Sequence, residues 1–233
     1  MTLSLAIFVA SIVFQICVLW LLARNAMWRQ YLFFSIYAIW ITLENVTLLA
    51  AYLRFPLFYS TLYWRFDSMD VVLRFLVVWE VFHQTFPIGS GLNRSLSKSL
   101  AMVAFLLLAF ACGVMFWGYQ NYASLRSIGL AQDRNFGFVQ AVMILGTLLM
   151  ARYYGVNYGR NVRGIALAFG GWVSISTASS AMADLANSFL PYWYYLRPLS
   201  FVAMVGAWIW ALWIYEPNPP INGLARRETS TVF

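Results

Sequence analysis

The stretch RFDSMDVVLRFLVVWEVFHQTF, residues 65–86, decides how the rest of this chain is interpreted. A membrane-spanning helix needs about 20 predominantly apolar residues, and this stretch is long and apolar enough. It nevertheless contains several ionisable side chains, namely Arg65, Asp67, Asp70, Arg74, Glu80 and His83. A charge at membrane depth costs at least ~2.5 kcal/mol, so these side chains need partners on neighbouring helices.

The composition of the whole chain indicates an all-α polytopic membrane protein. Of its 233 residues, 62% are hydrophobic and only 10% are charged. Soluble domains are ~45–50% apolar and ~25% charged, so the lipid bilayer is the expected surrounding. The net charge of +7 does not indicate a nucleic-acid partner, because the basic residues are scattered singly between apolar segments and form no basic face.

Seven segments are long and apolar enough for membrane-spanning helices. They lie at about residues 2–23, 31–53, 65–86, 98–118, 135–154, 164–190 and 197–215. We therefore expect a single seven-helix transmembrane domain over residues 1–215. The remaining residues, 216–233, are rich in proline and polar side chains, which predicts a flexible tail.

The basic residues in the short loops predict the orientation, because arginine and lysine are enriched on the cytoplasmic side. One side collects Arg24, Arg29, Arg94, Lys98, Arg152, Arg160, Arg163, Arg226 and Arg227. The other side collects Arg54, Arg65, Arg126, Arg134 and Arg197. This bias favours a multi-pass protein of the plasma (inner) membrane, with the N-terminus outside and the C-terminus in the cytoplasm.

A short internal similarity relates the two halves of the chain. WITL at Trp40 resembles WVSI at Trp172, and an arginine (Arg65 or Arg197) follows each tryptophan at the same spacing. This maps the first three helices onto the last three, with the fourth as a linker. Two explanations stay open: a 3+1+3 duplication, or chance similarity between apolar segments.

Helical geometry groups the polar residues of segment 65–86. With about 100° of rotation per residue, Asp67, Asp70 and Arg74 form one stripe, and Asp70 and Arg74 are an i,i+4 pair. Arg74 is predicted ~13 Å below the outer end of its helix. Glu44 has the same predicted depth on the preceding helix, so we expect it to pair with Arg74, instead of or alongside Asp70.

Asp184, predicted ~9 Å below the outer end of the sixth helix, is close to the expected depth of Asp70. The candidate ligand- or ion-binding site is therefore Glu44, Asp67, Asp70, Arg74 and Asp184. One interpretation is a structural ion-pair network that fixes helix register, and the other is an outward-facing, water-filled pocket. Because acids outnumber bases, such a pocket suits a cation, a proton or a polar solute.

Glu80 and His83 form a separate, secondary group nearer the cytoplasmic end. Their i,i+3 spacing permits a hydrogen bond along the helix. A solvated histidine at the membrane interface is one interpretation of His83, and a proton relay is the other.

Motifs for catalysis and cofactor binding are missing. The last apolar segment has no lysine for a retinal Schiff base, and a single histidine does not suffice for a haem or zinc site. Cys17 and Cys112 lack CxxC spacing. We therefore expect no enzyme, no cofactor and no metal.

Small-solute, cation or proton transport through the pocket is the leading hypothesis. The alternatives are a receptor or sensor with a separate protein partner, and a non-catalytic subunit of a larger membrane complex. A homo-oligomer is compatible with each of the three.

The segments YAIWITLENV around Glu44 and VVLRFLVVWEVFHQTF around Glu80 resemble a pattern in uncharacterised bacterial seven-helix membrane proteins. This resemblance implies the seven-helix fold and no particular activity. The 3+1+3 arrangement is also similar to that of PQ-loop and SWEET-type carriers, although the Pro-Gln dipeptide of that family is missing here.

Overall fold

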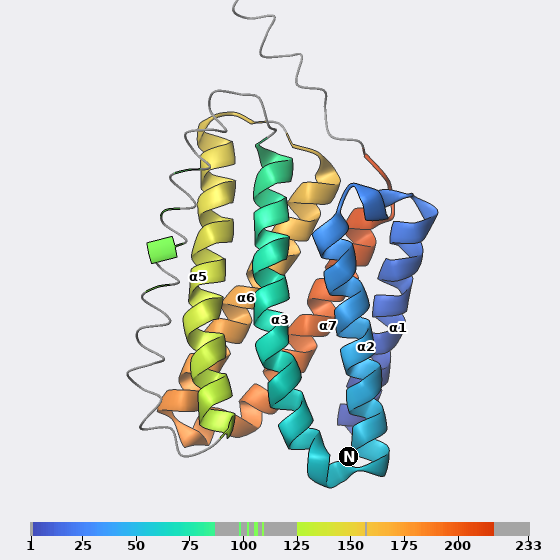
Figure 1. Ribbon diagram of the computed structural model, residues 1–233, viewed down its shortest axis with the longest axis vertical. Coiled ribbons are helices and arrows are strands. Elements are labelled where there is room, and N and C mark those ends of the chain that lie inside the picture. Colours follow the sequence, from blue (N-terminus) through green and yellow to red (C-terminus); the bar gives the residue numbers. More distant parts are fainter. Residues whose placement is uncertain are drawn as a thin grey trace, which may run out of the picture.

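The computed structural model describes residues 2–86, 125–156 and 158–216, together with five single positions between 98 and 109. The described elements are helices: α1 (Thr2–Arg24), α2 (Leu32–Arg54), α3 (Pro56–Thr85), α5 (Leu125–Tyr153), α6 (Arg160–Leu185) and α7 (Leu190–Leu212), with short 3₁₀ turns η1 (Met27–Arg29) and η2 (Asn187–Phe189) (Figure 1). The all-α prediction is confirmed. Apart from those five positions, the span expected at 98–118 lies outside the described residues, as does the tail after residue 216.

Five of the described helices are long and apolar enough to cross a membrane: α1, α2, α5, α6 and α7. Their outward faces support this environment. On α1, Val9, Val13, Ile16 and Trp20 recur at helical spacing and are all exposed. A helix at an aqueous surface carries polar residues on its outer face, so this apolar stripe fits contact with lipid.

The six long helices of the described chain form a closed ring. Each helix packs on the next in the order α1, α2, α3, α5, α6 and α7, and α7 packs on α1. Helices α1, α3, α5 and α7 begin at one end of the ring, whereas α2 and α6 begin at the other (Figure 1). Side chains from helices far apart in the sequence therefore meet inside the ring.

An aromatic core fills the ring near the end where α2 and α6 begin. The ring centroids of Phe34 and Trp208 are 4.8 Å apart, and those of Tyr37 and Phe169 are 5.8 Å apart. At the same end, the Asn161 side chain donates to the carbonyls of Ala211 and Ile214, at 2.8 and 3.1 Å. Because Asn161 is at the start of α6, these bonds fix the end of α7 against it.

Several helix boundaries differ from those expected from the sequence. Helix α3 begins at Pro56 instead of residue 65, and α5 begins at Leu125 instead of 135. Helix α7 begins at Leu190 instead of 197, and α6 ends at Leu185 instead of 190. The sequence-based starts were placed near Arg65, Arg134 and Arg197, because isolated charges are costly inside a membrane. For Arg197, the ion pairs with Asp67 and Asp133 inside the ring remove that objection, whereas Arg65 is exposed.

Candidate functional site

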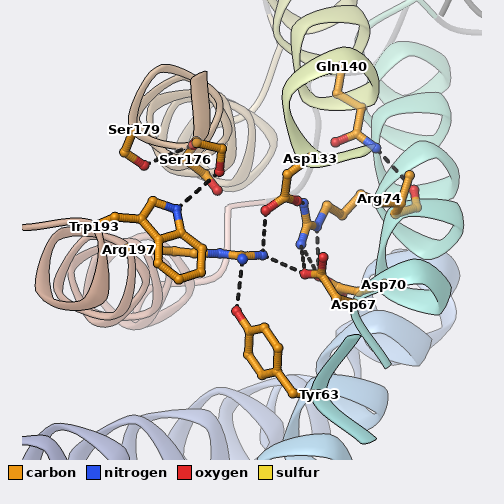
Figure 2. Close-up of polar contacts among 12 residues, drawn as sticks. Tyr63, Asp67, Asp70, Arg74, Asp133, Gln140, Ser176, Ser179, Trp193 and Arg197 are labelled. Carbon is orange, nitrogen blue, oxygen red and sulfur yellow. Dashed lines mark hydrogen bonds and ion pairs between the residues drawn. The ribbon is translucent and has the colours of Figure 1, made fainter. Parts of the chain in front are cut away.

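Three aspartates and two arginines form one ion-pair network inside the ring (Figure 2). Helix α3 contributes Asp67, Asp70 and Arg74, α5 contributes Asp133, and α7 contributes Arg197. All five residues are between 2% and 8% exposed. The network therefore ties together three helices that are distant in the sequence.

Arg74 is the member with the most ion-pair partners, since it faces all three aspartates. Its Nε donates to Asp70 Oδ2 at 2.7 Å, and its Nη2 donates to the same oxygen. Its Nη1 donates to Asp133 Oδ1 at 3.2 Å, and Asp67 Oδ1 lies 3.7 Å from Nη2. The guanidinium carbon is 4.6 Å from the centroid of the Trp172 ring, a cation–π contact.

Arg197 forms the second centre of the network. Its Nη2 donates to Asp67 Oδ1 at 2.5 Å and lies 2.8 Å from Asp133 Oδ2. Its Nη1 donates to the hydroxyl of Tyr63 at 2.8 Å (Figure 2). The Trp193 ring lies 5.4 Å from the guanidinium carbon, so the cation also faces an aromatic surface.

The network contains more negative than positive groups. Three carboxylates face two guanidiniums, and an arginine side chain always keeps its charge. Three carboxylate oxygens are buried and accept no hydrogen bond in the described part of the structure: Asp67 Oδ2, Asp70 Oδ1 and Asp133 Oδ2. Asp133 Oδ2 still has an ion-pair partner, Arg197 Nη2 at 2.8 Å, whereas Asp67 Oδ2 and Asp70 Oδ1 have none. Buried charge without a partner is costly, so these oxygens require a proton, water or a cationic group.

A cavity of about 750 Å³ reaches this network. Its walls come from α1, α2, α3 and α7, with Trp172 of α6 beside Arg74. Asp67 and Asp70 both line it, as does Glu44 of α2, which is only half-buried. Much of the remaining wall is aromatic or aliphatic, so the cavity has an acidic region within an apolar surface.

The stripe expected from helical phase is present, since Asp67, Asp70 and Arg74 meet at the network, and Asp70 and Arg74 form the i,i+4 pair. The expected pairing of Glu44 with Arg74 is wrong for the described residues, in which every ion pair of Arg74 is with an aspartate. The reason is depth. Because α3 begins at Pro56, Arg74 is ~27 Å along it, whereas Glu44 is ~15 Å from the adjoining end of α2.

Asp184 and Arg197 also differ from expectation. Asp184 is in the last turn of α6, next to its final residue Leu185, and therefore not at the depth predicted for it; its side chain lies outside the described part of the molecule. Arg197, placed at the outer end of the last span from the sequence, is within α7 and buried in the network.

Glu80 has a separate, structural role. Its two carboxylate oxygens accept hydrogen bonds from the backbone amides of Phe33 and Phe34, at 3.0 and 2.7 Å. These amides belong to the first turn of α2, where backbone donors lack partners within the helix. The expected hydrogen bond between Glu80 and His83 is not found among the described residues. The His83 ring instead contacts Trp79, with centroids 4.5 Å apart.

Asp133 is the member of the network that sequence reasoning missed. It was placed before the fifth helix, yet α5 begins at Leu125. A signal for the longer helix was available: Asp133, Gly137, Gln140 and Thr147 recur at helical spacing, and all are buried. Following that polar row upstream would have placed Asp133 on the inner face.

Comparison with protein-family models, curated proteins and solved structures gives no match for this chain. The chemistry of the network and the cavity therefore carries the functional interpretation.

Proposed function

We propose that this protein is a seven-helix membrane protein that binds a small solute or cation in the cavity and transports it. The observation that carries the proposal is the contact between a cavity of about 750 Å³ and buried carboxylates with unpaired oxygens. Ligand sites in proteins are typically ~300–1,000 Å³ and contain a few polar groups in an apolar wall. The resemblance in helices α2 and α3 agrees with the seven-helix fold and adds no activity.

A purely structural role for the charges is less well supported. A network that only fixes helix register is expected to pair each buried polar atom, because every unpaired one costs stability. Here Asp67 and Asp70 each retain an unpaired oxygen, and both residues line the cavity. That arrangement favours a site that exchanges its partner.

The shape of the interior supports transport over simple binding. The cavity ends at Arg74 and Trp172, and the aromatic core around Phe34 and Trp208 fills the ring beyond them. A polar site near the membrane midplane, closed on one side by such a core, suits alternating access. Among the described basic residues, Arg24 and Arg160 belong to the closed end, so we assign that end to the cytoplasm.

The ring also supports the seventh crossing and the 3+1+3 arrangement. Helices α3 and α5 begin at the same end of the ring, so Thr85 and Leu125 lie at opposite ends (Figure 1). The sequence between these two residues contains the apolar segment 98–118, which is long enough for one further span. In the first half of the ring α1 packs on α2 and α2 on α3. In the second half α5 packs on α6 and α6 on α7 in the same way.

An accessibility experiment tests the proposal. Asn45 lines the cavity, and its neighbour Val46 is 48% exposed on the outer face of α2. In a background with Cys17 and Cys112 replaced by serine, Asn45→Cys should react with a membrane-impermeant thiol reagent added outside the cell. Val46→Cys, facing lipid, should remain unlabelled. Equal, negligible labelling of both variants would show that no aqueous path reaches the cavity and would reject the proposal.

A further inference from the structure

We propose that the ligand of the cavity is an organic cation: a protonated amine carrying an apolar or aromatic body. This inference rests on the proposed function and adds the chemical class of the ligand. Three features of the site lead to it: the charge of the network, the unpaired carboxylate oxygens and the aromatic wall.

The charge of the network selects against anions. Both arginines are already committed, Arg74 to Asp70 and Asp133, and Arg197 to Asp67 and Tyr63. An anion entering the cavity would have to displace one of these carboxylates. It would also meet the excess negative charge of the network, and the Glu44 carboxyl group in the cavity wall offers it no positive partner.

The unpaired oxygens supply the acceptors that an ammonium group needs. Asp67 Oδ2 and Asp70 Oδ1 have no hydrogen-bond partner among the described residues, and both side chains are at least nine-tenths buried and line the cavity. An alkylammonium carries several N–H donors and one positive charge. It would satisfy these oxygens and neutralise the single excess charge of the network in one step.

The wall of the cavity suits the rest of such a ligand. Tyr59 and Tyr63 stack with centroids 6.2 Å apart, and Trp64 and Trp193 stack at 6.4 Å. All four line the cavity. Tyrosine and tryptophan faces attract cations and cover apolar groups. A hydrated metal ion would leave most of this aromatic surface unused, and the described residues contain no cluster of three or more His, Cys, Asp or Glu suited to a metal.

Three probes with the same aromatic body and different charges test the inference: phenethylamine, phenethyl alcohol and hydrocinnamate. Their binding to the full chain in lipid nanodiscs would be measured by isothermal titration calorimetry. We expect phenethylamine, protonated at neutral pH, to bind at least ~10-fold more tightly than the alcohol, and hydrocinnamate not to bind; each ~1.4 kcal/mol is a factor of ten.

Two variants and a control locate the effect. Asp70→Asn should weaken phenethylamine binding at least ~10-fold, since a tenfold change needs only ~1.4 kcal/mol. Glu44→Gln should also weaken phenethylamine binding. This substitution breaks no ion pair of the described network, so it still tests the inference if Asp70→Asn misfolds. The control is Glu216→Gln, because Glu216 is exposed and remote from the cavity.

The outcomes separate the ligand class from the proposed function. Equal binding of phenethylamine and phenethyl alcohol, unchanged in both variants, overturns the cation inference while the cavity remains a binding site. Binding of none of the probes, with Asn45→Cys still labelled from outside, also overturns it and leaves the accessible cavity standing. Only failure of the labelling rejects the proposed function itself.

Discussion

Replacing Arg197 should strongly destabilise the protein, whereas replacing its partner Asp133 should cost much less. The geometry makes the two changes unequal. Arg197→Gln leaves three carboxylates facing Arg74 alone, so the excess negative charge of the network doubles. Asp133→Asn leaves two carboxylates facing two guanidiniums, so the excess disappears.

The magnitudes follow from the contacts that are lost. Removing one partner from a buried ion pair costs ~3–5 kcal/mol, because the other charge stays buried. Arg197 contacts Asp67 at 2.5 Å and Asp133 at 2.8 Å, so we place Arg197→Gln in the upper part of that range. Asp133→Asn loses hydrogen bonds between charged groups, worth ~1.5–3 kcal/mol, and leaves no added charge.

The assay is unfolding in mixed micelles titrated with sodium dodecyl sulfate, followed by tryptophan fluorescence. The double variant Arg197→Gln/Asp133→Asn returns to a single excess charge, so it should be more stable than Arg197→Gln alone, with a coupling energy of at least ~1 kcal/mol. The control Arg65→Gln changes an exposed arginine of the same charge. Two results would refute the reasoning. One is that the unfolding free-energy changes of the single variants simply add in the double variant. The other is that Arg197→Gln lowers the free energy of unfolding no more than Arg65→Gln does.

Further predictions concern close packing and the start of α2. Gly164→Ala places a methyl group 2.3 Å from Ala211 Cβ and should cost ~1–3 kcal/mol of unfolding free energy in the same assay, and no loss would contradict the packing. Gly171→Ala, on the same helix with no atom within 4 Å, should be neutral or stabilising by up to ~1 kcal/mol. Glu80→Ala leaves two backbone amides of α2 without acceptors and should lower the free energy of unfolding by ~1–3 kcal/mol. The amide hydrogens of that first turn should then exchange with solvent faster. His83→Ala should leave that exchange unchanged, and a similar loss in both variants would remove the capping role of Glu80.

The features that depend on local sequence could be predicted well. The apolar segments gave α1 and α2 nearly to the residue, because both are uniformly apolar and contain few charges. Helical phase alone placed Asp67, Asp70 and Arg74 on one face of α3. A period of 3.6 residues relates neighbours on one helix and needs no knowledge of the others.

The features that depend on contacts between helices could not be predicted in the same way. The expected spans leave Asp133 outside the fifth helix and put Arg197 at the outer end of the seventh, since each charge alone is too costly for a helix interior. In the structure Arg197 Nη2 lies 2.8 Å from Asp133 Oδ2, and each charge reduces the free-energy cost of burying the other. That compensation joins α5 to α7, and nothing in the local pattern reveals it.

The depth of Arg74 was predicted wrongly because the start of α3 was placed too late. Treating Arg65 as the outer end of α3 moved Arg74 towards that end and made Glu44 its apparent partner, whereas the helix continues back to Pro56. Proline is well suited to the first turn of a helix, so Pro56 was the better boundary signal.

Ligand protection tests the central claim most directly, namely that the acidic network forms the base of an outward-facing cavity for an organic cation. The rate at which an impermeant thiol reagent labels Asn45→Cys from outside would be measured with increasing phenethylamine, with hydrocinnamate as the matched anion. The structure predicts labelling that phenethylamine suppresses saturably and hydrocinnamate does not. Labelling that neither probe slows, or that both slow equally, would contradict it.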